Sequence, residues 1–241
     1  MESKKAIQYK YALNSENQTV YIGDLERTPG LRNQAFTCIS CENILIPKLG
    51  KIRSKHFAHK YIASCSEETY LHKLVKNLFV QEYQKCLDTR SPFELELEIP
   101  QICNTYETFF GTTCTLEIIE KPFDLTKRYT RVSLETREGE FIPDVLLSND
   151  SGIQKLFVEI AVTHFLSEKK VNSSFKIIEI QIKSEEDIDF IHQRLIRQSD
   201  PKVKFINLDI KPDVSFYCKD KECPTKMGMF IVLKSGKLLH I

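Results

Sequence analysis

Two charged side chains stand in the middle of apolar runs that have the composition of buried strands. Asp144 lies in Phe-Ile-Pro-Asp-Val-Leu-Leu, and Glu159 lies in Leu-Phe-Val-Glu-Ile-Ala-Val. Burying an ionised carboxylate costs several kcal/mol unless a partner compensates its charge. The turn-like Ser-Asn-Asp-Ser-Gly at 148–152 predicts that the two runs form a hairpin. A hairpin would bring both carboxylates to one end of a sheet.

This pair of acids predicts a site for a divalent cation. Two carboxylates brought together raise one pKa sharply unless a cation lies between them. A hard cation such as Mg²⁺ or Mn²⁺ prefers oxygen ligands, and it commonly acts on phosphate groups. Asp144 and Glu159 therefore favour phosphate chemistry.

Length and composition are those of an ordinary globular protein. The 241 residues can bury one substantial core with a small appended module. The net charge is only +1, from 34 basic and 33 acidic residues, so any phosphate-binding surface must be a local patch. No stretch approaches the roughly 20 apolar residues of a membrane span, and the N-terminus lacks the apolar core of a signal peptide. We expect a cytoplasmic protein without membrane contact, whose eight cysteines are reduced and available to metals.

The order of predicted elements is that of a strand-rich α/β chain. A hairpin at 6–13 and 19–23 precedes a Cys/His-rich stretch, and apolar spacing predicts a helix from Ser66 to about Leu87. The predicted strands are 93–99, 112–119, 129–135, 141–147, 155–163, 175–182 and 203–209, with helices at 167–172 and 184–197 and a last hairpin at 229–233 and 237–241. We divide the chain into an N-terminal hairpin and zinc-binding module (1–65), a core domain (66–211) and a C-terminal hairpin extension (212–241).

The Cys/His-rich stretch predicts a structural zinc site. Around a hairpin predicted at 44–48 and 51–56, it supplies five candidate ligands for four positions: Cys38, Cys41, His56, His59 and Cys65. Either both histidines, or one histidine with Cys65, would complete the Cys38–Cys41 pair, and spacing does not choose between them. The alternative is a chance clustering of buried cysteines and surface histidines. Zinc is favoured because so short a hairpin would not be stable without it.

Two weaker signals accompany this module. Its basic side chains would contact a phosphate backbone or simply form a solvated face: Lys48, Lys51, Arg53, Lys55 and Lys60. Near the C-terminus, Cys218 and Cys223 would be either half of a second metal site or small buried cysteines.

The motifs occur in an order that resembles the CoiA-like competence-protein family. Cys-x-x-Cys, His-Phe-Ala-His and a further cysteine are followed by Glu68-x-x-x-His72-x-x-x-Lys76, by Pro-Asp and by the strand acid Glu159. The likeness covers about residues 6–210. It implies a zinc ribbon-like module joined to a restriction-endonuclease-like domain of the PD-(D/E)xK type, a mixed sheet flanked by helices. It also implies Mg²⁺ held by Asp144, Glu159 and the Ile160 carbonyl, with Glu68 reaching in from the helix.

One position departs from the PD-(D/E)xK pattern. That pattern has a lysine two residues after the strand acid, where this chain has Ala161. We expect Lys170, and with less support Lys169, to supply the missing ammonium group. If both are only solvated, the site is inactive. Further side chains expected to line the site are His72, Lys76, Glu135, Thr163 and His164.

Three functions are compatible with these motifs. The first is a metal-dependent nuclease acting on nucleic acid, with DNA favoured, in DNA uptake, recombination or defence against foreign DNA. The second is an inactivated nuclease fold that binds nucleic acid, which Ala161 favours. The third is an interaction protein whose zinc ribbon docks a partner. Assembly into a homodimer, or with a protein partner in DNA processing, would fit each of them.

Overall fold

The computed structural model describes residues 9–50, 54–61, 64–104, 107, 111, 113–214 and 230–240. Contacts divide the chain into two compact units, one of residues 1–96 with 123–208 and one of residues 97–122 with 209–241. The first unit contains both the Cys/His-rich stretch and the strand carboxylates. The boundaries predicted at 65 and 211 stay predictions.

The N-terminal part of the first unit is an antiparallel sheet. The strands lie side by side in the order β2-β1-β3-β4-β5. Along the chain they are β1 (Tyr11–Leu13), β2 (Thr19–Tyr21), β3 (Phe36–Thr37), β4 (Ile44–Lys48) and β5 (His56–His59). Two short 3-10 helices, η1 (Ile22–Asp24) and η2 (Pro29–Asn33), connect β2 to β3. The hairpin of β1 and β2 confirms the first predicted hairpin, with Ala12 opposite Val20. The partner of β4 begins at His56 rather than at 51, and residues 51–53 lie outside the described part of the chain. Phe36 and Phe57 are buried and pack against each other.

Helix α1 (Glu67–Thr89) confirms the longest predicted helix. It begins at Ser66, whose side chain accepts a hydrogen bond from the Thr69 N–H, and two acidic residues in its first turn suit the positive end of the helix dipole. The helix ends where Arg90 takes a left-handed conformation. Leu74, Val75 and Phe79 form part of its fully buried face.

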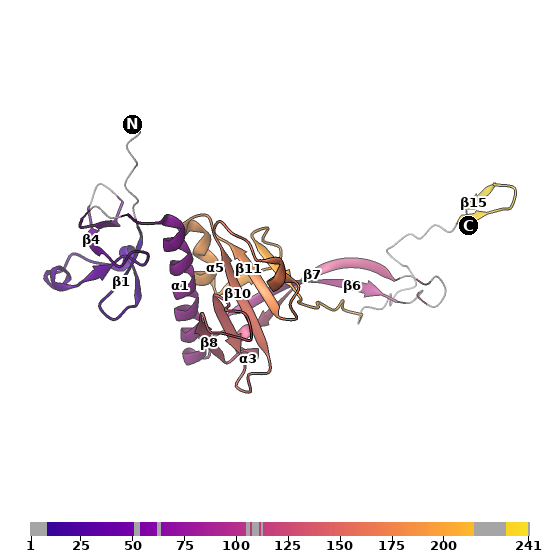
Figure 1. Ribbon diagram of the computed structural model, residues 1–241. Helices are drawn as coiled ribbons and strands as arrows, with labels where there is room; N and C mark the ends of the chain where they lie inside the picture. Colours follow the sequence, from indigo (N-terminus) through magenta and orange to yellow (C-terminus); the bar gives the residue numbers. More distant parts are fainter. Residues whose placement is uncertain are drawn as a thin grey trace. The chain divides into compact units, whose positions relative to one another are not determined.

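The central sheet of the first unit has the strand order β13-β11-β10-β9-β8 (Figure 1). Its strands are β8 (Arg131–Leu134), β9 (Val145–Ser148), β10 (Lys155–Ala161), β11 (Lys176–Gln181) and β13 (Val203–Ile206). β9 and β10 form the predicted antiparallel hairpin, with Val145 opposite Val158. Asp144 directly precedes Val145 and Glu159 directly follows Val158, so the two acids lie at the same end of the hairpin. β10 and β11 are parallel. The sheet is therefore mixed, and β10 is buried from Leu156 to Ala161.

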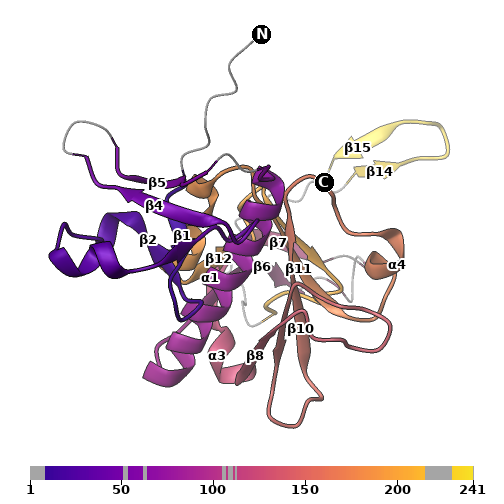
Figure 2. The same cartoon turned by 60° about the vertical axis from the view of Figure 1, so that its left-hand side comes forward.

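Helix α1 packs against this sheet and contacts β8 and β10 (Figure 2). Two further short helices belong to the same unit, α3 (Leu125–Arg128) and α4 (Glu168–Val171). A phenylalanine- and isoleucine-rich cluster around Phe157 and Ile177 fills part of the core, with Phe175 stacked on Phe157 at 4.4 Å between ring centroids. The packing explains why these strands read as nearly continuous apolar runs.

The single helix predicted at 184–197 is wrong. The segment forms a 3-10 turn η3 (Glu185–Ile188), a short helix α5 (Asp189–Gln193) and a strand β12 (Leu195–Arg197). Arg194 takes a left-handed conformation, with its guanidinium 2.6 Å from Glu82 on α1, and so ends the helix. The following residues then pair in parallel with the start of β6 (Glu94–Cys103), and Ile196 becomes buried there. Tertiary pairing thus overrides local helical spacing.

The second unit contains the remainder of β6, most of β7 (Cys114–Asp124) and the chain after 208. Both strands are longer than predicted. The described end of the chain forms the predicted hairpin, of β14 (Phe230–Val232) and β15 (Leu238–His240), with Gly236 at positive φ in its turn. Among the described residues, none of the helices has the length and apolar content required to cross a membrane.

Candidate functional site

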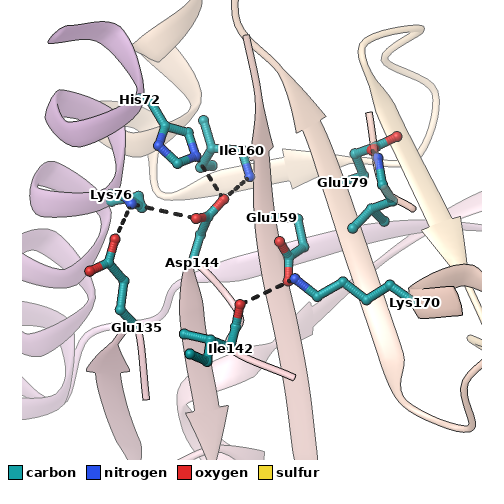
Figure 3. A network of polar contacts seen from close by, with 10 residues as sticks. His72, Lys76, Glu135, Ile142, Asp144, Glu159, Ile160, Lys170 and Glu179 are labelled. Carbon is teal, nitrogen blue, oxygen red and sulfur yellow. Dashed lines mark hydrogen bonds and ion pairs between the residues drawn. The ribbon is translucent and has the colours of Figure 1, made fainter. Parts of the chain in front are cut away.

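Asp144 lies directly before β9 and is held by donors from two sides (Figure 3). Its Oδ2 accepts a hydrogen bond from the Ile160 N–H at 2.8 Å and lies 3.0 Å from His72 Nε2, while Oδ1 lies 3.5 Å from Lys76 Nζ. Burial by itself would raise the pKa of Asp144. The hydrogen bonds from His72 and Ile160 and the nearby positive charges outweigh burial and hold that pKa below its usual value. Asp144 is therefore the ionised acid of the pair.

Glu159 lies within β10 and is 7% exposed. The Lys170 ammonium lies 2.6 Å from its Oε1, an ion pair rather than a well-formed hydrogen bond, because Oε1 accepts none from the described residues. Burial raises the pKa of Glu159 to about 7; Lys170 opposes the rise, and the charges of Asp144 and Glu179 add to it. The surroundings of the two strand acids thus drive their pKa values apart, which is common where acids act in catalysis.

Of the two candidate lysines, Lys170 is the one whose side chain lies beside Glu159. It lies on α4, its side chain is 13% exposed, and its ammonium reaches the Ile142 carbonyl as well as Glu159. Ala161 is buried two residues after Glu159 and offers no polar group. Lys169 instead pairs with Glu140 at 2.6 Å and is 69% exposed. The structure brings Lys170, and not Lys169, to the strand acid.

Lys76 is a buried cation on α1. Its ammonium lies 2.5 Å from Glu135 Oε1 as well as 3.5 Å from Asp144. Glu135 is largely exposed and has positive φ, a conformation that costs a non-glycine residue energy. The backbone N–H of Glu135 donates to the Asp144 carbonyl, so β8 and the Pro-Asp segment are held together beside the helix.

Two adjoining cavities open at these acids. The smaller, of about 250 Å³, is lined by Asp144, Glu159 and Lys170, and the larger, of about 580 Å³, by Glu68, Lys76 and Glu135. Asp144, His72, Ile160 and His164 line both. The Thr163 hydroxyl donates a hydrogen bond to Glu68 Oε1, and both residues line the larger cavity rather than the one that contains Glu159.

The donor set fits a hard divalent cation. Two carboxylates line one cavity, and a buried carboxylate oxygen there accepts no hydrogen bond from the described residues. Carboxylate and carbonyl oxygens are the ligands that Mg²⁺ and Mn²⁺ prefer. Among the described residues, Asp144 is contacted by the side chains of His72 and Lys76 and by the Ile160 N–H. The side chain of Glu159 is contacted by Lys170, and no arginine pairs with either acid in the described part of the chain.

The sequence reasoning missed a third acid of this cavity, Glu179. It is 4% exposed on β11, in register with Glu159. Its Oε1 accepts a hydrogen bond from the Leu166 N–H at 2.7 Å. The signal was present, because Lys-Ile-Ile-Glu-Ile-Gln places a carboxylate inside an apolar run, as do the segments around Asp144 and Glu159.

Four of the five predicted zinc ligands come together. The ligand atoms of Cys38, Cys41, His59 and Cys65 all lie within 4.8 Å of one another. A tetrahedral zinc ion with bonds of about 2.3 Å to sulfur separates its ligand atoms by about 3.8 Å, and Cys38 Sγ lies 3.5 Å from Cys65 Sγ. The Cys3His cluster could therefore hold a structural zinc. His56 is not part of it, and its Nδ1 lies 3.0 Å from the Ser54 carbonyl.

The basic residues of the module do not form a uniform set. Lys48 and Lys60 are exposed. The Lys55 ammonium donates to the carbonyls of Gly23 and Leu25 and so holds η1 against the start of β5. Lys51, Arg53, Cys218 and Cys223 lie outside the described residues.

Comparison with known proteins agrees with the motifs. Residues 24–68 match the model of a family described as competence protein CoiA, N-terminal domain. This match supports the resemblance to the CoiA-like competence-protein family over the Cys/His-rich stretch, and the motifs after residue 68 lie outside it. The matched stretch contains all four residues of the Cys3His cluster. No curated protein matches the chain. No solved structure matches it either.

Proposed function

We propose that the chain is a metal-dependent nuclease that hydrolyses phosphodiester bonds in nucleic acid, with DNA as the favoured substrate. One observation carries the proposal: Asp144 and Glu159 line a single cavity, and the Lys170 ammonium lies 2.6 Å from Glu159. The match of residues 24–68 to the CoiA N-terminal domain model supports a role related to competence, and a nuclease would serve DNA uptake, recombination or defence. The restriction-endonuclease-like arrangement of the PD-(D/E)xK type belongs to the same proposal.

Each residue of the site has a part in this reaction. Asp144, Glu159 and the Ile160 carbonyl would hold Mg²⁺ or Mn²⁺. Such an ion polarises the scissile phosphate and lowers the pKa of a bound water. Lys170 would orient the attacking water or neutralise charge that develops on the phosphate. His72 and Lys76 hold Asp144 in place from the helix side. Glu68, in the adjoining cavity, would contact the ion's water shell or the substrate.

A second candidate is an inactive nuclease fold that binds nucleic acid. Ala161 favours it, because the side chain in the usual place of the lysine cannot act on water or charge. Lys170 argues against it, since this ammonium occupies the space beside the strand acid. In either case the Cys3His cluster would hold a structural zinc.

The test is cleavage of DNA and RNA with and without Mg²⁺ or Mn²⁺. Loss of one carboxylate ligand in Asp144→Asn should lower metal-dependent cleavage by about 100-fold or more. Asp150→Asn is the matched control, because Asp150 lies in the turn between β9 and β10, is 74% exposed and pairs only with Arg131 among the described residues. Equal activity of wild type and Asp144→Asn would overturn the proposal. Salt-sensitive binding without cleavage would establish the second candidate.

A further inference from the structure

Helix α4, which carries Lys170, is too short to be stable without tertiary contacts. Helix α4 has four residues, and Ser167 at its start makes no side-chain capping bond. Isolated helices shorter than about 12 residues are marginal in water, so a helix of this length depends on tertiary contacts. Whether the Lys170 ammonium reaches Glu159 is therefore decided by what holds the two ends of this segment.

The end after α4 is held by Asn207. Its side-chain amide donates to the Ser173 carbonyl at 2.6 Å and to the Phe175 carbonyl at 3.0 Å. It also lies 3.5 Å from the Val171 carbonyl. Asn207, which directly follows β13, thus supplies hydrogen-bond donors to backbone carbonyls at the end of α4 and in the turn after it.

The end before α4 is held by Glu179. Its Oε1 accepts the hydrogen bond from the Leu166 N–H, which lies one residue before Ser167. Its Oε2 lies 3.7 Å from Lys204, and the same ammonium lies 4.5 Å above the ring of Phe165. The segment 165–166 is therefore tied to β11 and β13 through one buried carboxylate and one lysine.

A carboxylate at this position is costly. Glu179 is 4% exposed, and its neighbours Ile178 and Ile180 are buried isoleucines. An apolar residue would avoid the loss of hydration that a buried carboxylate suffers. A charge-assisted hydrogen bond to a backbone N–H is stronger than a neutral one and offsets part of that loss. An apolar residue could not accept the hydrogen bond from the Leu166 N–H, so the carboxylate is what fixes the position of the Leu166 backbone.

We propose that Glu179 is a positioning residue, which fixes the start of α4 and so keeps the Lys170 ammonium at Glu159. In this proposal Glu179 acts through the Leu166 backbone and the placement of Lys170. The placement of Lys170 is a structural claim, and only its consequence for cleavage rests on the proposed nuclease function.

The experiment measures the reactivity of individual lysines toward trace acetic anhydride, read by mass spectrometry. In the wild type, Lys170 should react slowly, because its side chain is 13% exposed and ion-paired, and Lys169, at 69% exposure, should react fast. Glu179→Leu should raise the reactivity of Lys170 severalfold, toward that of Lys169. Glu179→Gln keeps an oxygen that can accept from the Leu166 N–H and should leave Lys170 protected.

Lys76 controls for general unfolding. Its side chain is 6% exposed on α1, so it should stay protected in every folded variant. If Lys170 becomes reactive while Lys76 stays protected, the release is local and supports the proposal. If both become reactive in Glu179→Leu, Glu179→Met, an unbranched side chain of about the same length as glutamate, is measured in its place. Continued protection of Lys170 in folded Glu179→Leu, or in folded Glu179→Met when that variant is used, overturns the proposal.

Cleavage assays separate the two proposals. If the wild type cleaves nucleic acid, Glu179→Leu should lower kcat with little change in KM, and Glu179→Gln should recover most of the lost rate. If the wild type does not cleave, the nuclease proposal fails, and the lysine reactivities still decide the role of Glu179. A Glu179→Gln variant that releases Lys170 as Glu179→Leu does would show that the acceptor oxygen is not the anchor.

Discussion

Asp144 and Glu159 are neighbours on adjacent strands, yet their carboxyl groups have opposite pKa shifts. Asp144 accepts a backbone hydrogen bond and lies between His72 and Lys76, which favours the ionised form. Glu159 is buried with one lysine beside it and lies near two other acids, which favours the protonated form. The apolar runs predicted that both acids are buried. The division of charge between them comes from the burial of Glu159 and from the groups around Asp144, of which His72 and Lys76 lie on α1 and are encoded by neither strand.

The raised pKa of Glu159 gives a prediction for stability. The folded protein keeps the Glu159 proton up to a pKa of about 7, whereas the unfolded chain releases it near the usual 4.5. The folded state thus binds more protons between these values, and the free energy of unfolding should fall as pH rises from about 4.5 to 7. At about 1.4 kcal/mol per pKa unit, this residue contributes at most about 3.5 kcal/mol to the fall.

Chemical denaturation in buffers without Mg²⁺ or Mn²⁺ measures this effect. Glu159→Gln cannot ionise, so its free energy of unfolding should change less between pH 4.5 and 7 than that of the wild type. Parallel curves for wild type and Glu159→Gln would contradict the pKa assignment.

Among the elements, the Cys3His cluster is joined directly to the helix of the candidate site. Cys65 is followed at once by Ser66, which caps α1. The Ser66 carbonyl accepts from the Ser40 hydroxyl, and Lys73 on α1 donates to the Ser40 carbonyl. The turn between Cys38 and Cys41 is thereby bonded to the first turns of α1. The sequence placed the motifs in order along the chain, but this contact required the folded structure.

The two histidines of the module give a matched prediction. His59→Ala should remove the zinc ion or weaken its binding strongly, and it should lower the melting temperature, because binding energy at a structural zinc site is folding energy. His56→Ala should keep one zinc per Cys3His cluster, since His56 lies outside the cluster. Metal content by mass spectrometry and thermal unfolding measure both. Equal zinc content in the two variants would contradict this ligand set.

For the whole molecule, the net charge of +1 gives no general attraction to nucleic acid, so binding must come from local patches. Of the basic residues predicted to contact phosphate, Lys48, Lys55 and Lys60 are exposed in the described part of the chain, and the Lys55 ammonium donates to carbonyls of its own module. If Lys48 and Lys60 bind phosphates, changing both to alanine should weaken DNA binding. The slope of log affinity against log salt should become shallower by about 0.9 for each phosphate that is no longer neutralised.

The control for this prediction lies elsewhere on the first unit. Lys85 and Lys127 are 61% and 84% exposed on α1 and α3, and each pairs only with an acid three residues away among the described residues. Changing both to alanine alters the net charge equally and should leave the salt slope unchanged. Unchanged affinity after loss of Lys48 and Lys60 would favour a module that docks a protein partner.

The residue pattern predicted the hairpin of the two acidic strands, the long helix and the set of candidate zinc ligands. Each is encoded locally, by apolar spacing, turn residues or short motifs, because these depend on backbone geometry over a few residues. Long-range packing in the folded chain fixed which histidine joins the cysteines, that residues 195–197 form a strand, and that Lys170 reaches Glu159 with Glu179 beside it. Those outcomes depend on contacts between residues far apart in the chain, whose burial and hydrogen bonding outweigh local preference.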